Sequence, residues 1–580
     1  MNRIILSLLI VFPLLLGARP WQIKFSPSLS AADAYKISLN GEFSGGKTVE
    51  IKDDTRYLLS NLSGKIKRGT KLKAIAYTVI DSDKDQDRFI GVGADWFLTC
   101  FINGKNVLST EPGGNVFTRI SAYNHIANIK LKKGKNHLVL YIRPNLYQWK
   151  FAFRLMPQLD MLPAHPIDRM RMLSGMFPVE NPGLLRKELI HRMSGSRAAV
   201  SCQFGTPVIC GVRYRKSTET PEQSKIHWHT VSGKRVVRTV HLMELEDLTP
   251  DTEYIYDVVT LDTNTAKILA ASSGKFKTFP AKGINHNFVI IGDTQVAPDI
   301  RKQMVKNMLK LPAGKQADFI VSLGDVAENF DNFETHYFDF FLNILKQNNC
   351  SKPAMIVKGN HEYRGNGAEA FDRHFGRSYY SFRHGEVFYI VLDTGEGAET
   401  IWKPGHHLLW TDTEALFKEQ KKWLKQLTGS PEFKNAKYRI VISHASPFKY
   451  HAKFYGANVR KLTGEFFFGA KPANRIDLWL CGHVHYASRF DPATKTLYGF
   501  PFAKREKAKV DADDLADINF PVITNDGPGQ GGEQLSVTAV NVTENGIKVV
   551  ISTPEGKIID DVFIEKGKPH TVKKSVLQKL

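Results

Sequence analysis

The chain has 580 residues, too many for a single hydrophobic core, so we expect two to four domains. Hydrophobic residues make up 42% and charged residues 24% of the sequence, which excludes disorder on a large scale. The formal net charge of +21 should attract anions such as phosphorylated compounds or nucleic acid, although scattered lysines on an ordinary surface are the simpler explanation.

The first residues have the pattern of a secretory signal peptide. Asn2-Arg3 precedes an apolar run from Ile4 to Leu16, and Gly17-Ala18 supplies small residues that suit cleavage. The run is short for a membrane span, and an uncleaved N-terminal anchor is the alternative. We therefore predict a signal peptide over residues 1–18, export to the periplasm or the extracellular space, and no transmembrane anchor after cleavage.

The chain has five cysteines without the CxxC spacing of a structural zinc site. Cys202 and Cys210 flank a short stretch that contains Gly and Pro, and a disulfide between them could bridge a hairpin. At least one thiol must stay unpaired, so the chain is not a disulfide scaffold even if it is exported.

Residues 19–165 show short alternating runs that predict an all-β domain. Asn103-Gly104 follows a strand pattern and is the strongest available hairpin signal. A second turn, Lys132 to Asn136, leads into the strand His137 to Ile142. We predict a β-sandwich accessory domain that loosely resembles the jelly-roll domains of secreted bacterial hydrolases. It would act as a spacer, or would bind carbohydrate or another envelope polymer, because a fold alone does not specify a function.

Residues 166–282 predict a second β-sandwich. In the stretch Leu248 to Tyr256, a tight Pro turn feeds a strand with a buried Tyr, which resembles the corner of a fibronectin type III domain. A closing strand, Gly274 to Pro280, ends this fibronectin III-like domain.

From residue 283 to 580, buried strand patterns alternate with helical patterns, which is typical of a layered α/β domain. Helices are predicted over 300–309, 335–345 and 414–427. Strands are predicted over 288–291, 319–323, 355–357, 388–392, 438–442 and 478–480.

A short polar motif follows five of these buried strands, and α/β folds place their ligands at the carboxyl ends of strands. Asp, His and Asn side chains are expected ligands of Zn, Mn or Fe, and carboxylate-rich sites extend to Mg. The motifs are Gly292-Asp293-Thr294-Gln295, Gly324-Asp325-Val326-Ala327-Glu328-Asn329, Gly359-Asn360-His361-Glu362, Ser443-His444-Ala445-Ser446-Pro447 and Gly482-His483-Val484-His485.

The set and order of these motifs resemble the calcineurin-like metallophosphoesterases, over about residues 286–490. The resemblance implies an α/β domain of four layers (α-β-β-α). The predicted fold class is therefore multidomain, with two N-terminal β-sandwich domains followed by the metallophosphoesterase domain. A fibronectin III-like sandwich directly before such a domain also resembles the purple acid phosphatases.

The resemblance implies two divalent or mixed-valence metal ions, with Fe, Mn or Zn foremost and Mg as a further candidate. Asp325 would bridge both ions, while Asp293 and His485 would bind the first. The second ion would be held by Asn360, His444 and His483. His483 and His485 alternate with Val484, so in a strand both would face one side.

Three further residues are candidates at this site. His361 would not be a ligand; it would protonate or stabilise the leaving oxygen while a metal-bound hydroxide attacks phosphorus. The family commonly has His where this chain has Gln295, whose amide oxygen could bind a hard metal or a water. Purple acid phosphatases have a ligand Tyr where this chain has Glu328, so no purple ferric centre is expected. Gln295 and Glu328 would be further ligands or would hold other ligands in place.

These features predict a secreted, metal-dependent hydrolase of phosphate mono- or diesters. One alternative, prompted by the net charge, is a nuclease-type phosphodiesterase that acts on nucleic acid, which we do not favour. Another is a non-catalytic envelope- or glycan-binding protein on a phosphatase scaffold.

Overall fold

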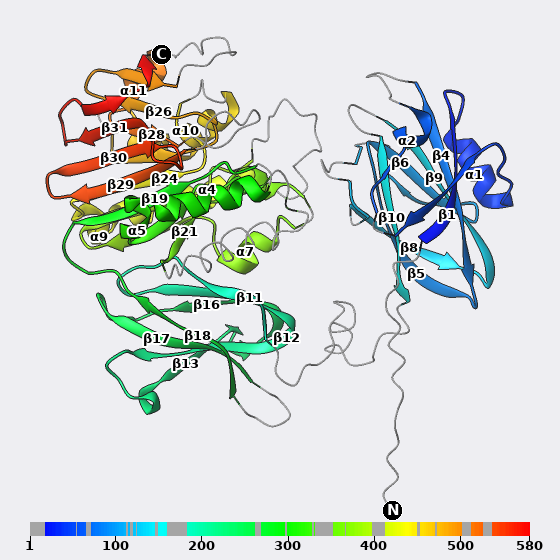
Figure 1. Ribbon diagram of the computed structural model, residues 1–580, viewed down its shortest axis with the longest axis horizontal. Helices are drawn as coiled ribbons and strands as arrows, with labels where there is room; N and C mark the ends of the chain where they lie inside the picture. Colours follow the sequence, from blue (N-terminus) through cyan, green and yellow to red (C-terminus); the bar gives the residue numbers. More distant parts are fainter. Residues whose placement is uncertain are drawn as a thin grey trace, which may run out of the picture. The chain divides into compact units, whose positions relative to one another are not determined.

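Figure 1 shows the computed structural model of the chain. It describes residues 18–53, 55–64, 71–111, 114–115, 120–122, 124–144, 149–158, 183–261, 268–295, 298–327, 330, 352–365, 367–396, 412–448, 453–469, 472–500, 512–525 and 536–579. The helix predicted over 335–345, Glu328, Cys350 and all of the predicted signal peptide except Ala18 lie outside these residues. The chain divides into two compact units, one that ends at Ala164 and one that begins at His165.

The first unit is a pair of antiparallel sheets with a hydrophobic core between them. Trp21, Trp149 and Phe151 are buried in that core, and Trp21 meets Phe151 edge to face with 5.3 Å between ring centroids. One sheet has the order β2 (Lys47–Lys52), β1 (Ala18–Ser26), β4 (Lys73–Ser82), β9 (Gly134–Arg143), β6 (Phe97–Ile102) and β7 (Lys105–Ser109). The other has the order β3 (Tyr57–Leu58), β10 (Lys150–Gln158), β5 (Gln86–Ala94) and β8 (His125–Leu131).

The hairpin predicted at Asn103-Gly104 is confirmed, since these two residues join β6 to β7. Their φ angles are 48° and 73°, the left-handed conformation that a two-residue turn between twisted strands requires. On the outer face of the six-stranded sheet lies the helix α1 (Ala31–Asn40), and the side chain of Ser30 caps its first turn.

The second unit begins with a group of antiparallel strands. They are β11 (Leu184–His191), β12 (Ala198–Lys216), β13 (Lys225–Trp228), β16 (Val237–Leu245), β17 (Glu253–Leu261) and β18 (Ile268–Lys277). In the stretch from Leu248 to Tyr256, the buried Tyr254 accepts a hydrogen bond from the backbone of Thr249 at 2.8 Å. This sheet continues into the next part of the chain, since β11 pairs in parallel with β21 (Ala354–Ile356).

The expected hairpin between Cys202 and Cys210 is wrong, because both residues lie on the single strand β12. The intervening Gly and Pro fall where the register against β16 shifts between Gln203 and Val208, so they bulge the strand instead of reversing it. Both thiols are buried and free, and their Sγ atoms lie 3.9 Å apart.

The remainder of the second unit contains two facing sheets, and the central strands of each sheet are parallel. In the first, β21, β20 (Phe319–Ser322) and β19 (His286–Ile291) are parallel, and β29 (Val537–Thr543), β30 (Gly546–Ser552), β31 (Ile558–Ile564) and β32 (Thr571–Ser575) extend it in antiparallel fashion. The second has the order β22 (Tyr380–His384), β23 (Val387–Leu392), β24 (Tyr438–Ser443), β25 (Leu478–Cys481), β28 (Val522–Thr524), β26 (Ser488–Asp491), β27 (Thr496–Gly499) and β33 (Gln578–Lys579).

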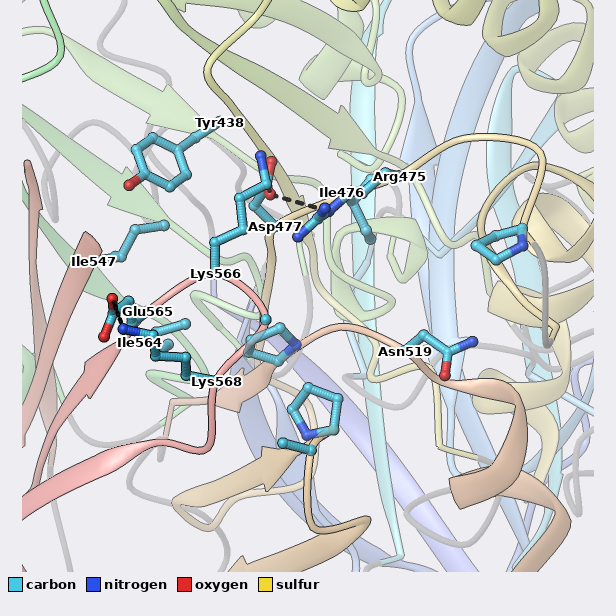
Figure 2. A pocket seen from close by; sticks show the side chains of 15 residues that line it. Tyr438, Arg475, Ile476, Asp477, Asn519, Ile547, Ile564, Glu565, Lys566 and Lys568 are labelled. Atoms are coloured by element: carbon cyan, nitrogen blue, oxygen red, sulfur yellow. Dashed lines mark hydrogen bonds and ion pairs between the residues drawn. The ribbon is translucent and has the colours of Figure 1, made fainter. Parts of the chain in front are cut away.

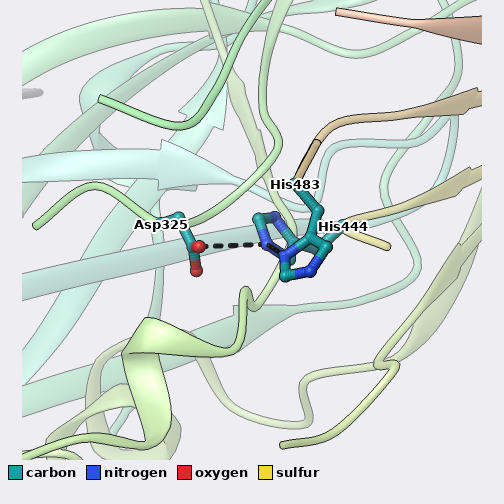
Figure 3. Close-up of side chains that lie close together, drawn as sticks. All are labelled: Asp325, His444 and His483. Carbon is teal, nitrogen blue, oxygen red and sulfur yellow. Dashed lines mark hydrogen bonds and ion pairs between the residues drawn. The ribbon is translucent and has the colours of Figure 1, made fainter. Parts of the chain in front are cut away.

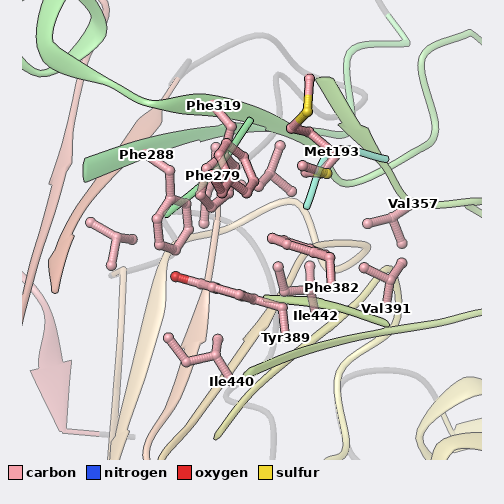
Figure 4. Close-up of a cluster of buried hydrophobic side chains, with 14 of the residues drawn as sticks. Met193, Phe279, Phe288, Phe319, Val357, Phe382, Tyr389, Val391, Ile440 and Ile442 are labelled. Carbon is pink, nitrogen blue, oxygen red and sulfur yellow. The ribbon is translucent and has the colours of Figure 1, made fainter. Parts of the chain in front are cut away.

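Side chains of both sheets fill the space between them (Figure 4). Phe319 of β20 stacks on Phe288 at 4.7 Å and meets Tyr389 of β23 edge to face at 5.7 Å. The helices α4 (Pro298–Lys310) and α7 (Ala370–Phe375) share a core with the outer face of the first sheet. The second sheet packs in the same way against α8 (Thr413–Gly429) and α10 (Lys453–Phe467). The layers therefore follow the order helix, sheet, sheet, helix.

None of the helices that the structure describes is both long enough and apolar enough to span a bilayer.

Candidate metal centre

The polar motifs lie together because parallel strands end at the same edge of a sheet. In the first sheet, β19 leads to Asp293, β20 to Asp325 and β21 to Asn360. In the second sheet, β24 ends directly before His444 and β25 before the loop with His483 and His485.

His444 is the hub of the cluster (Figure 3). Its Nδ1 lies 2.8 Å from the carbonyl of Leu323, to which it donates, and this hydrogen bond turns Nε2 into the cluster. Nε2 lies 3.1 Å from Asp325 Oδ2, from Asn360 Oδ1 and from His483 Nδ1. Each of these three atoms carries a lone pair and a partial or full negative charge. They repel one another, and a cation placed among them would bind all three. The donor set fits a metal ion with nitrogen and oxygen ligands.

A second group of candidate ligands adjoins the first. His485 Nε2 lies 3.6 Å from Asp293 Oδ1, and Gln295 Nε2 donates to Asp325 Oδ2 at 2.9 Å. The other amide atom, Gln295 Oε1, is buried and has no hydrogen-bond partner among the described residues. A buried acceptor of this kind beside two carboxylates would be satisfied by a cation, so the geometry suits a second ion as well.

Four of these side chains stand on backbone in the left-handed region, which is rare for residues other than Gly. The φ angles are 51° at Asp293 and Asp325, 74° at His483 and 59° at His485. The expectation that His483 and His485 share a face of a strand is wrong, because β25 ends at Cys481 and both histidines lie in a loop. They reach the same cluster through this loop conformation.

The glycines in the motifs are required by space. A Cβ on Gly359 would lie 2.3 Å from Asp325 Oδ1 and 2.5 Å from the backbone nitrogen of the same residue. A Cβ on Gly482 would lie 2.3 Å from Asp293 Oδ2. Both contacts are shorter than atoms tolerate, so the two carboxylates keep their places only against glycine.

Glu362 supports the cluster from behind, a role that its place in the motif did not reveal. Its carboxylate accepts backbone hydrogen bonds from Asp325 at 2.9 Å, Val326 at 3.0 Å and Gly359 at 2.8 Å. These bonds join the turn after β20 to the turn after β21. Burial, together with the nearby charge of Asp325, raises the pKa of Glu362 to about 7.

The electrostatics of the cluster favour a positive charge at its centre. Burial disfavours the charged form of His444, but the carboxylates of Asp325 and Asp293 outweigh burial and raise its pKa to about 10. Burial also acts against the ionised form of Asp325, yet the imidazoles of His361 and His444 hold its pKa well below the usual range. A site that stabilises an imidazolium this strongly stabilises a metal cation for the same reason.

His361 lies at the edge of the cluster on η3 (His361–Tyr363). Its backbone donates to Asp325 Oδ1 at 2.8 Å, and its Nε2 lies 3.6 Å from Asp325 Oδ2. The side chain is 12% exposed, whereas His444 is fully buried, so solvent reaches His361. Arg364 lies against its ring, with Nη1 2.8 Å from Nε2 and 3.1 Å from Nδ1.

A scan against protein-family models matches residues 286–487 to the calcineurin-like phosphoesterases. This part of the chain is a calcineurin-like phosphoesterase domain. The family is metal-dependent and acts on phosphoric esters, so the chain is a hydrolase of this class, and its substrate is phosphorylated.

Three solved structures are among those that match the chain. The structure of PhoD matches with 14% identity and a TM-score of 0.44, and covers 69% of this chain and 94% of PhoD. The purple acid phosphatase PPD1 from yellow lupin (Lupinus luteus) seeds matches with 13% identity and a TM-score of 0.44, and covers 85% of this chain and 92% of PPD1. A dimetal phosphatase from Danio rerio has 13% identity and a TM-score of 0.30, with 48% of this chain and 98% of that one covered. A search of curated proteins found no match.

Every predicted site residue that the structure describes lies in this one cluster of the phosphoesterase domain; Glu328 is outside the described residues. Sequence reasoning named Glu362 in a motif but missed its supporting role. It also missed Arg364 and Glu396, whose side chains pair at 3.1 Å beside His361. Arg364 could have been found two residues after the Gly359-Asn360-His361-Glu362 motif, but Glu396 is distant in the sequence and carries no local signal.

A groove of about 500 Å³ lies elsewhere on the same domain (Figure 2). It is lined by Tyr438, the first residue of β24, and by Asp477, which directly precedes β25. Asp477 is paired there with Lys566 at 3.1 Å. The groove is thus at the amino ends of the strands whose carboxyl ends carry His444 and His483.

Proposed function

We propose that the chain is an exported phosphoesterase that hydrolyses phosphate monoesters or diesters at a pair of metal ions. The convergence of Asp325, Asn360 and His483 on His444 Nε2, each at 3.1 Å, carries the proposal. This arrangement lies within a domain whose family hydrolyses phosphoric esters.

The proposed ligands divide into two sets that share Asp325. One ion would be held by Asp293, His485 and the amide oxygen of Gln295. The other would be held by Asn360, His444 and His483. Two such ions, when bound, polarise a phosphoryl group and lower the pKa of a water molecule. The mixture of imidazole and oxygen donors, without thiolate, supports Fe, Mn or Zn and leaves Mg as a further candidate.

The protein's own contribution to the reaction would come chiefly from His361. Its imidazole lies at the edge of the cluster, where solvent reaches it, and its backbone is fixed by the hydrogen bond to Asp325. From this position it would donate a proton to the leaving oxygen of the ester, the general-acid role that an imidazole can fill.

The experiment that tests the proposal compares Asp325→Asn with Asp53→Asn. Asp53 is a matched control because it is also buried and ion-paired, to Arg19 at 2.9 Å, but lies in the first unit. We expect about two metal ions per wild-type chain by elemental analysis. Asp325→Asn should lose them and lower aryl-phosphate hydrolysis at least about 100-fold. Asp53→Asn should keep both properties and lose only stability, by about 1–3 kcal/mol.

A wild-type protein without stoichiometric metal, even after loading with Mn, Fe or Zn, would contradict the proposal. It would then favour the non-catalytic alternative, in which the first unit binds an envelope polymer and which a glycan-binding screen can test.

Export and substrate choice need separate tests. The pattern of residues 2–18 supports export, and N-terminal sequencing of the mature protein would reveal cleavage near Ala18. Action on nucleic acid stays a prediction prompted by the net charge of +21. It requires binding to DNA or RNA that weakens steeply with salt, and absence of binding at low salt would remove it.

A further inference from the structure

Arg364 places a guanidinium group beside the proposed catalytic histidine. Its Nη1 lies 2.8 Å from His361 Nε2, and that nitrogen lies 3.6 Å from Asp325 Oδ2. The guanidinium is therefore within reach of a phosphoryl group bound at Asp325. Its side chain is 13% exposed, so it lies at the same partly open edge of the cluster as His361.

Glu396 holds this arginine from the other side. Arg364 Nε donates to Glu396 Oε2 at 3.1 Å, and Glu396 is 1% exposed. The backbone carbonyl of Glu396 accepts a hydrogen bond from Thr413 at 2.9 Å, which ties it to the start of α8. A buried carboxylate fixed in this way sets the direction of the guanidinium plane.

The same loop also holds the neighbouring residue of the motif. Tyr363 donates to Asp393 Oδ2 at 2.6 Å, and the backbone of Asp393 is bonded in both directions to the side chain of Gln420 of α8. Together with Glu396, Asp393 therefore anchors the turn that carries His361 and Arg364 to the second sheet and its helix.

We propose that Arg364 binds the phosphoryl group of the substrate, that Glu396 positions it, and that the site prefers phosphate monoesters. The inference rests on the proposed function. A guanidinium offers paired N–H donors that match phosphate oxygens, and it stabilises the charge that develops on them during the reaction. A monoester carries more negative charge and one more terminal oxygen than a diester, so an added cation favours the monoester.

Arg364→Gln and Arg364→Lys test the inference, with Arg439→Lys as the matched control. Arg439 is equally exposed, at 13%, and pairs with Asp477 beside the groove in Figure 2, at the other end of β24. Three quantities would be measured on metal-loaded protein: metal content, the affinity for inorganic phosphate by calorimetry, and kcat/KM for an aryl phosphate and for a bis-aryl phosphate.

We expect Arg364→Gln to keep its metal and to bind phosphate at least about tenfold more weakly, as the loss of a charge-assisted contact predicts. The value of kcat/KM should fall about 100-fold for the monoester but less than about tenfold for the diester. Arg364→Lys should recover only part of the loss, because lysine lacks the planar fork. Glu396→Gln should weaken phosphate binding by a smaller factor, and Arg439→Lys should change none of these quantities.

Phosphate affinity that is unchanged in Arg364→Gln, or weakening that comes with loss of metal, would overturn a role in substrate binding. Equal losses for both esters would overturn the monoester preference. Failure of the proposed function has a different result: the wild type itself would hydrolyse neither ester. In that case the phosphate titration still shows whether Arg364 binds a phosphoryl group. A wild type that binds no phosphate would overturn the inference.

Discussion

The first unit and the phosphoesterase domain are both built on two facing sheets, but the strand ends have different roles. They carry turns in the first unit and candidate site residues in the phosphoesterase domain. In the first unit every neighbouring strand is antiparallel, so successive ends lie at opposite edges and are joined by turns such as Asn103-Gly104. In the phosphoesterase domain β19, β20 and β21 are parallel, as are β23, β24 and β25. Parallel strands of one sheet end at the same edge, so several carboxyl ends gather at one place.

The backbone shows the same contrast. Among the described residues of the first unit, Asn103 is the residue other than Gly with a left-handed φ, and it serves a turn. In the phosphoesterase domain that conformation occurs at Lys495, in the turn between β26 and β27, and also at four proposed ligands: Asp293, Asp325, His483 and His485. Left-handed backbone therefore serves turns in both regions, but only in the phosphoesterase domain does it also carry proposed ligands, which packing must hold in place.

The largest expected effect comes from Gly359→Ala, with Gly429→Ala as control. The added methyl group would displace Asp325 by contacts of 2.3 and 2.5 Å, whereas a Cβ on Gly429 meets no atom within 4 Å. We expect Gly359→Ala to lower aryl-phosphate hydrolysis at least about 100-fold and to lose metal, since small displacements at a site have large effects. Normal metal content in this variant would show that the turn can adapt.

A smaller effect should follow from changing either of two buried glutamates, one at the candidate metal centre and one in the antiparallel strands at the start of the second unit. Glu362→Gln places an amide N–H group against backbone donors, and we expect metal affinity to fall about 10- to 100-fold. Glu188 of β11 is a buried acceptor of hydrogen bonds from Tyr256 of β17 and Ser272 of β18. Glu188→Gln should lower thermal stability without changing the metal titration. Equal metal affinities in both variants would remove the supporting role of Glu362.

Acid should destabilise the phosphoesterase core through its buried histidines. Burial lowers the pKa of His286 to about 4 and that of His384 to about 2. The unfolded chain, with pKa values near 6.5, binds more protons below that pH, so the free energy of unfolding falls as pH drops from about 6.5 toward 4. Each histidine contributes up to about 1.4 kcal/mol per pH unit.

His384→Phe tests this titration. Phe can keep the ring contacts with Phe279 and His286, whose ring centroids lie 4.5 and 4.1 Å away, and it removes one proton-binding group. Denaturant unfolding at pH 7 and pH 5 should show a smaller loss of stability in the variant than in the wild type. Equal losses would mean that His384 is not protonated on unfolding in this range.

The smallest effect is expected in the first unit. Gly104→Ala puts a side chain on a residue with φ of 73°, which should cost about 1 kcal/mol. The unfolding temperature of that unit should drop by a few degrees, measured by calorimetry, while metal content and hydrolysis stay unchanged. A change in hydrolysis would show that the first unit influences the site.

Much of the phosphoesterase domain followed from local pattern. The strands at 288–291, 438–442 and 478–480 were predicted within two residues of β19, β24 and β25, because buried parallel strands are continuous apolar runs. The expectations about Cys202 and Cys210, and about His483 and His485, failed for a common reason. The Gly and Pro between the two cysteines bulge a strand, and alternating residues can lie in a loop, so neither pattern fixes the backbone by itself.

The sequence by itself determined the types of residue available for chemistry and the strand that precedes each one. The spacing of apolar residues and the position of glycines determine strands and turns over only a few residues, so a local pattern is enough to predict them. It also determined the family of the phosphoesterase domain, through the order of its motifs. Only the tertiary structure decided that Glu362 bonds to the turn after β20, and that Glu396 meets Arg364. Such contacts join residues about 30 or more positions apart, and their geometry depends on how two sheets pack, which no local pattern records.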